Sequence, residues 1–158
     1  MRIFIAVTML VSLQENKLAD REFLVGTWEG KGKASFGDFT STYTWEWGPG
    51  KKSLRYTSVM KSVGVERTEE GHVAWDADLK NYARIGFTSD GSINRGEGEA
   101  TDAKETWIFV SKVSGSSVMK EMRSTLKKVD KDNVELTVET KKDGKWETFF
   151  TVSYARKQ

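Results

Sequence analysis

Apolar and polar residues alternate one by one along most of the chain beyond about residue 40, which is the pattern of half-buried β-strands. Aromatic and β-branched residues occupy the alternate positions in "TSTYTWEW", "SLRYTSVMK", "NYARIGFTS", "ETWIFVSKV", "MKEMRSTLKK", "NVELTVETK" and "KWETFFTVSYARK". Short connections such as "SDGS" and "KDGK" separate these segments and are typical of hairpin turns. The pattern predicts about ten antiparallel strands, each paired with the next along the chain.

The segment Leu13–Leu24, "LQENKLADREFL", breaks this alternation and predicts a helix. It contains no glycine or proline, and Ser12 with Glu15 forms a capping-box pattern at its start. A small sheet of many short strands must remove its edges, either as a closed barrel or as a two-sheet sandwich. One short N-terminal helix followed by a meander of strands favours an all-β fold, a closed up-and-down antiparallel β-barrel.

Residues 1–24 are thereby set apart from residues 25–158, which we predict to form one barrel domain. The apolar run Ile3–Val11 is too short to span a bilayer, so no membrane span is expected. It fits either the apolar part of an export signal or an arm that packs on the barrel, or on a second copy in a homodimer. Exported (periplasmic or extracellular) and cytoplasmic locations are equally compatible with this pattern.

Charge and composition exclude several classes of function. The 25 basic and 23 acidic residues give a net charge of +2 and are interspersed, so nucleic-acid binding is not expected. The chain has no cysteine, and His72 is its one histidine, which excludes a two-histidine metal site and a Ser-His-Asp relay. Asp76 and Asp78 imitate the start of a calcium loop, but Lys80 takes the third ligand position. We predict no metal site and no catalytic residue.

Large aromatic residues supply much of the apolar surface and gather on single strand faces. Tyr43, Trp45 and Trp47 share one face of their strand, Trp107 and Phe109 share another, and Ile85 lies on the same face as Phe87. In the last strand, Trp146, Phe150, Val152 and Tyr154 outnumber Phe149 and predict the inner face. Such stripes fill the core of any barrel, but rigid rings also line a cavity well.

We therefore predict seven aromatic residues as the lining of a ligand cavity. They are Tyr43, Trp45, Trp47, Tyr56, Phe87, Trp107 and Phe109. Arg55, Arg84 and Arg123 also lie within strands, where an inward guanidinium would hold an anionic head group. Taken singly, each of these arginines is expected to face solvent.

Several motifs together resemble the calycin superfamily of lipocalin-like barrels, and in particular its bacterial DUF1579 type. They are "LVGTWEGKGK", "WEWGPGKKSLRYT", "GHVAWDADLKNYARIGFTSDGS", "ETWIF" and the closing "YARK", and the likeness covers about residues 18–156. The resemblance implies a barrel with a central cavity. It also implies that Trp28, which follows Gly26, closes one barrel end and packs against Arg156 of the last strand.

A related branch of haem-binding barrels, the nitrobindin-like proteins, shares the G-x-W start. Its haem-binding histidine lies late in the barrel, whereas this sequence has no histidine after His72. We therefore predict no cofactor and expect haem binding to be absent, although tyrosine is a further known haem ligand.

Three functions remain open at this stage. The first is non-catalytic binding of a small apolar or amphipathic molecule in the central cavity. The second is a fully packed barrel that acts in assembly or interaction with other proteins. The third is an isomerase or hydrolase of a small lipophilic substrate, which an inward arginine in reach of a tyrosine hydroxyl would favour. Fold alone does not separate them.

Overall fold

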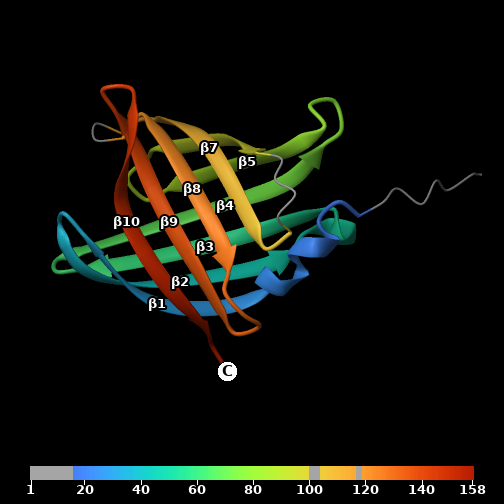
Figure 1. The fold of residues 1–158 in the computed structure, drawn as a ribbon, viewed down its shortest axis with the longest axis horizontal. Coiled ribbons are helices and arrows are strands. Elements are labelled where there is room, and N and C mark those ends of the chain that lie inside the picture. Colours follow the sequence, from blue (N-terminus) through green and yellow to red (C-terminus); the bar gives the residue numbers. More distant parts are fainter. Residues whose placement is uncertain (1–15, 100–103, 117–118) are drawn as a thin grey trace, which may run out of the picture.

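Ten strands form a closed barrel in the part of the chain that this computed structural model describes, residues 16–99, 104–116 and 119–158 (Figure 1). They are β1 (Gly26–Ala34), β2 (Gly37–Trp47), β3 (Ser53–Ser62), β4 (Val65–Asp76), β5 (Asn81–Thr88), β6 (Ile93–Glu99), β7 (Thr106–Ser114), β8 (Glu121–Lys128), β9 (Asn133–Lys142) and β10 (Lys145–Arg156). Each strand pairs antiparallel with its neighbour in sequence, and β1 also pairs with β10. The predicted up-and-down barrel is confirmed.

The N-terminal helix is the short 3-10 helix η1 (Ala19–Leu24), which ends just before Gly26 as predicted. Its type and length differ from the predicted helix over Leu13–Leu24, whose first residues lie outside the described part of the chain. Leu18, Arg21 and Leu24 are all buried, and their spacing of three residues matches the three residues per turn of a 3-10 helix. This geometry puts all three side chains on the face that packs against the barrel.

One end of the barrel is plugged by η1, beside the β2–β3 connection with its 3-10 turn η2 (Pro49–Lys51) (Figure 1). The indole nitrogen of Trp28 donates a 2.7 Å hydrogen bond to the Leu24 carbonyl. The Arg156 guanidinium carbon lies 4.1 Å from the centroid of a Trp28 ring, the pair that the resemblance implies. Arg156 also donates to the carbonyl oxygens of Val25 and Phe23, at 2.8 and 2.6 Å. Helix, first strand and last strand are thus joined at this end.

Gly26 is required where the chain leaves η1 and enters β1. Its φ of +125° is a conformation that residues with a side chain rarely adopt. A Cβ at this position would also lie 2.8 Å from the Arg156 guanidinium. Glycine therefore permits both the turn and the close approach of Arg156.

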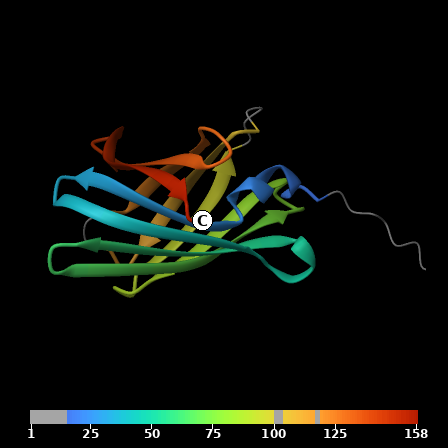
Figure 2. The same cartoon turned by 90° about the horizontal axis from the view of Figure 1, so that it is seen from below.

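The opposite end of the barrel carries the β1–β2 and β3–β4 hairpins (Figure 2). The aromatic core cluster, which includes Trp28, Trp45 and Trp107, extends from the plugged end toward the middle. A smaller cluster of Val113, Met119, Met122 and Val138 is separate from it. The interior is thus divided between a densely aromatic part and a part lined by smaller and more flexible side chains.

A β-bulge in β10 changes which residues face the interior. The register between β10 and β9 shifts between Thr148 and Phe150, so Phe149 is an extra residue. Phe149 and Phe150 therefore both face the cavity, whereas Trp146 lies on the outer face against Arg123 and Lys141. The prediction that Trp146 shares the inner face with Phe150 is wrong, because the bulge interrupts the alternation on which it rested.

The predicted apolar run Ile3–Val11 and the capping box of Ser12 and Glu15 lie outside the described residues. Among the residues described, no helix is both long enough and apolar enough to cross a membrane. The division into residues 1–24 and 25–158, the export signal and the homodimer stay predictions.

Candidate functional site

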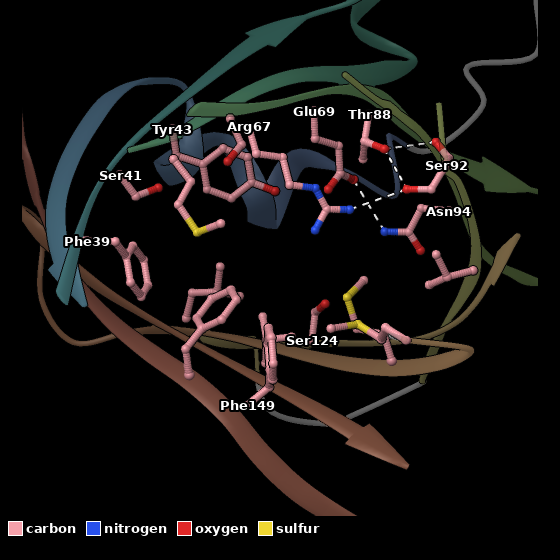
Figure 3. Close-up of a pocket in the computed structure, with 18 of the residues that line it drawn as sticks. Phe39, Ser41, Tyr43, Arg67, Glu69, Thr88, Ser92, Asn94, Ser124 and Phe149 are labelled. Carbon is pink, nitrogen blue, oxygen red and sulfur yellow. Dashed lines mark hydrogen bonds between the residues drawn. The ribbon is translucent and has the colours of Figure 1, made fainter. Parts of the chain in front are cut away.

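A cavity of about 100 Å³ lies inside the barrel, and one of its walls is polar. Strands β4, β5 and β6 supply Arg67, Glu69, Thr88 and Asn94 to this wall, and the connection before β6 supplies Ser92, with the side chains directed inward (Figure 3). Asn94 and Ser92 are buried, although polar side chains are usually exposed on strands of this kind. The interior is therefore not filled by apolar packing alone.

The facing wall is apolar and comes from β7 to β10 and the residues just before β8. It consists of Val113, Met119, Met122, Val138 and the two phenylalanines of the bulge. Figure 3 shows Phe149 across the cavity from Glu69 and Thr88. Methionine side chains are unbranched and flexible, so this wall can adapt to molecules of different shape.

The most buried charges of the site are Glu69 and Arg84. Their side chains are 20% and 9% exposed, and Arg84 Nη2 lies 2.8 Å from Glu69 Oε1. The Tyr56 hydroxyl donates to the same Glu69 oxygen at 2.6 Å and accepts from Arg84 Nε at 2.8 Å. The Arg84 guanidinium also lies 4.8 Å from the centroid of the Tyr56 ring. The three side chains form one closed network in which each is bonded to both others.

The pKa values keep this network charged at neutral pH. Burial alone would raise the pKa of Glu69, but the charge of Arg84 and the hydrogen bonds from Tyr56 and Arg84 outweigh burial and lower it. Burial would lower the pKa of Arg84, yet its interactions with Tyr56 and Glu69 raise it. Burial raises the pKa of Tyr56. The protons therefore stay in place, so the network is unsuited to acid-base catalysis near neutral pH.

Two glycines make the space for this network. Gly71 in β4 pairs with Gly86 in β5, and a Cβ on either would lie within 2.5 Å of the Tyr56 hydroxyl oxygen. A Cβ on Gly86 would also lie 2.4 Å from Glu69 Oε1. Two glycines in mid-strand, in "EEGHV" and "RIGFT", are the signal from which the sequence could have indicated a polar group at this position.

The strand arginines take different orientations. Arg84 faces the interior, so the expectation that it faces solvent is wrong. Arg55 is exposed, as expected. Arg123 lies on the outer face, where its guanidinium donates to both carboxylate oxygens of Glu139 at 2.6 and 2.7 Å and stacks on Trp146. Arg84 is the exception because Glu69 and Tyr56 compensate its burial.

Five of the seven residues predicted to line a cavity belong to the aromatic interior. Tyr43 lines the cavity itself. Trp45, Trp107 and Phe109 border a smaller void of about 20 Å³ toward the plugged end, where they pack against one another. The rings are in contact at centroid distances of 4.8 to 6.2 Å, so they act mainly as core in this structure.

Tyr56 is the fifth of these residues, and the other two, Trp47 and Phe87, lie elsewhere. Tyr56 is buried beneath the polar wall in the network described above. Trp47 lies near the plugged end, with the Lys51 ammonium 5.7 Å from its ring. Phe87 is 53% exposed, and its neighbour Gly86 takes the inward position, so the expectation that Phe87 faces the interior is wrong. Alternation alone could not fix the face of this strand, because glycine occupies an inward position.

The cavity offers few ligands for a metal ion. No group of three or more histidine, cysteine, aspartate or glutamate side chains suited to a metal occurs within the described ranges. His72 is exposed in the middle of β4, between the buried residues Gly71 and Val73. Its imidazole therefore lies on the outer face of the barrel.

Known structures of the same fold include a crystal structure of Rv2717c from M. tuberculosis. It superposes with a TM-score of 0.65 at 13% sequence identity, covering 89% of this chain and 97% of that chain. A de novo designed fluorescence-activating β-barrel gives a TM-score of 0.43 at 16% identity, with 85% and 94% of the two chains covered. Among curated proteins, none matches this sequence as a relative.

A family model identifies the chain more closely. The model of the THAP4-like, heme-binding beta-barrel domain matches residues 17–156. The prediction of no cofactor is wrong, because this family points to haem as a cofactor. The lipocalin-like barrel expected from the sequence agrees with the match. The chain therefore belongs to the family of THAP4-like, heme-binding beta-barrel domains.

Proposed function

We propose that the barrel binds a small amphipathic molecule in the cavity between the polar and the apolar wall. The apolar part of the molecule would contact Met119, Met122 and the phenylalanines of the bulge, and its polar end would face Glu69 and Asn94. The observation that carries this proposal is the two-sided lining of one buried cavity. Ligand sites in proteins combine mostly apolar walls with a few convergent polar groups in the same way.

The energetics of the polar wall support a binding role. Buried ion pairs such as Glu69 with Arg84 are costly to desolvate, and apolar replacements of similar volume are often neutral or stabilising. A barrel built for stability alone has no need of this network. Its retention inside the barrel is explained if the network orients a ligand.

Haem is the ligand that the family name gives, and the side chains of this chain allow a test of its fit. Haem iron is held by histidine, cysteine, methionine or tyrosine. His72 lies on the outer face, and the groups of these types at the cavity are the thioethers of Met60, Met119 and Met122 and the phenols of Tyr43 and Tyr154. Burial raises the pKa of Tyr154 to about 12 and disfavours the phenolate that binds iron. These residues do not fit a histidine-held haem.

The size of the cavity also favours a ligand other than haem. Its volume of about 100 Å³ is below the roughly 300 to 1,000 Å³ of pockets for drug-sized ligands. A ligand smaller than haem therefore fits this cavity better. The experiment described below also tests for bound haem.

Two alternatives have less support. The inward Arg84 lies within hydrogen-bond distance of the Tyr56 hydroxyl, the arrangement that favours an enzyme. The raised pKa of Tyr56 and the lowered pKa of Glu69, however, keep the phenol protonated and the carboxylate ionised near neutral pH. The packed barrel without a ligand leaves the buried polar wall unexplained. The likeness to the DUF1579 type stays a prediction.

Native mass spectrometry of the protein purified from its own host tests the proposal. We expect a retained small-molecule mass that is lost on denaturation, together with an absorption spectrum that reports any haem. Met122→Trp, which fills the apolar wall, should abolish the retained mass without unfolding the barrel. Arg55→Ala on the outer face is the control. Unliganded protein in every preparation, with no binding of small aromatic probes, would refute the binding role.

A further inference from the structure

Asn94 carries a hydrogen-bond acceptor without a partner inside the barrel. The residue is 4% exposed and points into the cavity (Figure 3). Its Nδ2 donates to Glu69 Oε1 at 3.3 Å, and because a carboxylate only accepts, this bond fixes the orientation of the amide. Asn94 Oδ1 is then left buried with no partner among the described residues. Buried polar atoms are nearly always paired in folded proteins, so this acceptor calls for a donor from a molecule in the cavity, either a ligand or a water that a ligand would replace.

Arg67 supplies the complementary donor on the same wall. Its Nε is buried and has no partner among the described side chains and backbone groups. Its Nη2 donates to Ser92 Oγ at 3.3 Å and lies 3.4 Å from Asp90 Oδ2, so the guanidinium is held in place. The polar wall therefore presents one unpaired donor and one unpaired acceptor.

The charges of this wall are already balanced. Arg84 is paired with Glu69 at 2.8 Å and Arg67 with Asp90 at 3.4 Å, so each arginine has its own carboxylate. A carboxylate ligand would lose its hydration without gaining an unpaired cation, which is unfavourable. A neutral polar group loses less hydration free energy, and hydrogen bonds to the unpaired atoms of the wall would offset that loss.

We infer that the cavity selects a neutral ligand whose polar end both donates and accepts a hydrogen bond, namely a primary amide or an alcohol. This inference rests on the proposed function. The ligand would donate to Asn94 Oδ1 and accept from Arg67 Nε, while its apolar body lies against the methionine and phenylalanine wall. An engineered apolar cavity of about 150 Å³ holds benzene, so a ligand of one ring is of the right scale.

Four probes with one ring and different polar ends test the inference by isothermal titration calorimetry. They are toluene, benzyl alcohol, benzamide and benzoate. We expect benzamide and benzyl alcohol to bind about tenfold more tightly than toluene or benzoate, as one or two buried hydrogen bonds provide. Asn94→Leu should weaken benzamide about tenfold and leave toluene unchanged. Asn133→Leu, at an exposed asparagine of β9, is the matched control and should change neither.

A second variant tests the charge balance. Asp90→Asn keeps an oxygen that accepts from the Ser92 backbone, a bond of 2.9 Å, but removes the charge that faces Arg67. We expect benzoate to gain affinity by about tenfold in this variant while benzamide is unchanged. Thermal melts of each variant check that the barrel is folded.

The outcomes separate the inference from the proposed function. If all four probes bind equally, or benzoate binds most tightly to the unaltered protein, the cavity binds ligands but the neutral-ligand inference is wrong. The same holds if Asn94→Leu leaves benzamide affinity unchanged. If no probe binds but the purified protein retains a ligand mass, the neutral-ligand inference is wrong and the binding function stands. If no probe binds and no ligand mass is retained, both are wrong.

Discussion

Gly71 and Gly86 lie directly opposite each other in β4 and β5, and the Tyr56 hydroxyl occupies the space that a side chain on either would fill. The pair forms a notch in the inner surface of the barrel. Without the notch, Tyr56 could not reach Glu69, and Arg84 would lose the partners that compensate its burial. Two residues without side chains thus determine where charge is held inside an aromatic barrel.

Adding a methyl group at Gly86 tests this notch. We expect Gly86→Ala to lower the free energy of unfolding by about 1 to 3 kcal/mol, because its Cβ would lie 2.5 Å from the Tyr56 oxygen and 2.4 Å from Glu69 Oε1. The loss should be smaller, though not zero, when the hydroxyl is removed first in the Tyr56→Phe background, because the remaining clash is with the end of a side chain. Urea unfolding of the four proteins in this double-mutant cycle measures the coupling.

Gly71→Ala is the matched control for that cycle. Its Cβ would also lie 2.4 Å from the backbone carbonyl oxygen of Ile85, which Tyr56→Phe does not move. The loss at Gly71 should therefore remain in the Tyr56→Phe background. Equal rescue at both glycines would mean that the tyrosine hydroxyl is not what the glycines accommodate.

Glu69→Gln tests the buried ion pair. We expect a loss of about 3 kcal/mol in the free energy of unfolding at pH 7, because Arg84 is left buried without a countercharge. Glu66→Gln is the control in the same strand, since Glu66 pairs with Lys61 at 2.9 Å but is 57% exposed. The control should cost less than about 1 kcal/mol. Similar losses in the two variants would contradict a special role for the buried pair.

The pH dependence of this loss has a defined sign. The pKa of Glu69 is lowered in the folded state, so the unfolded chain takes up the proton first as the pH falls below about 4.3, the ordinary value for glutamate. The stabilisation from Glu69 is present above that pH and is lost as the pH falls toward the folded-state pKa. The difference in the free energy of unfolding between the unaltered protein and Glu69→Gln should therefore become smaller as the pH falls from 5 to 3, measured by urea unfolding at each pH. A difference that stays constant or grows would show that a group other than Glu69 is responsible for the pH dependence.

Trp28→Ala is expected to destabilise the barrel without changing its ligand preference. Trp28 is 1% exposed at the plugged end, so its removal leaves a hole and should cost about 3 to 5 kcal/mol in urea unfolding. The ratio of benzamide to toluene affinity should stay the same, because Trp28 does not line the cavity. Trp146→Ala on the outer face is the control and should cost clearly less. A stable Trp28→Ala protein with an altered ratio of benzamide to toluene affinity would show that the binding site lies at the plugged end.

His72→Ala tests how this barrel interacts with haem. Since the imidazole of His72 lies on the outer face, we expect a hemin titration to give the same Soret absorption and the same affinity with and without it. Met122→Leu, which removes a thioether that lines the cavity, is the comparison variant. Loss of the Soret signal in His72→Ala alone would show that the histidine reaches the iron, in contradiction to the orientation of β4 described above.

The fold was predictable because its signals are local. Alternation predicts the strands, and glycine and aspartate predict the turns. How the barrel closes follows from the resemblance to lipocalin-like barrels, which the G-x-W start and the closing Tyr-x-Arg carry. The inward position predicted for Trp146 in the last strand is wrong, because one extra residue at Phe149 reverses the alternation and leaves no mark in composition.

The site was less predictable because it depends on partners far apart in sequence. Arg84 faces inward through Tyr56 and Glu69, 28 and 15 residues away along the chain. Taken singly, each of the three has an outward or a core position as its most common environment. Only the strand register brings them together, and the opposed glycines are the one trace of this in the sequence.

The pairing of β1 with β10 has a consequence for the order of the chain. Trp28 lies opposite Arg156, and the Lys157 backbone nitrogen donates to the Thr27 carbonyl at 2.8 Å, so the ladder has no first or last strand. The same ring of strands would result from a circular permutant that joins Lys157 to the start of η1 and opens at the β9–β10 hairpin around Gly144. Such a permutant would keep both walls of the cavity while its new termini emerge at the end far from the plug.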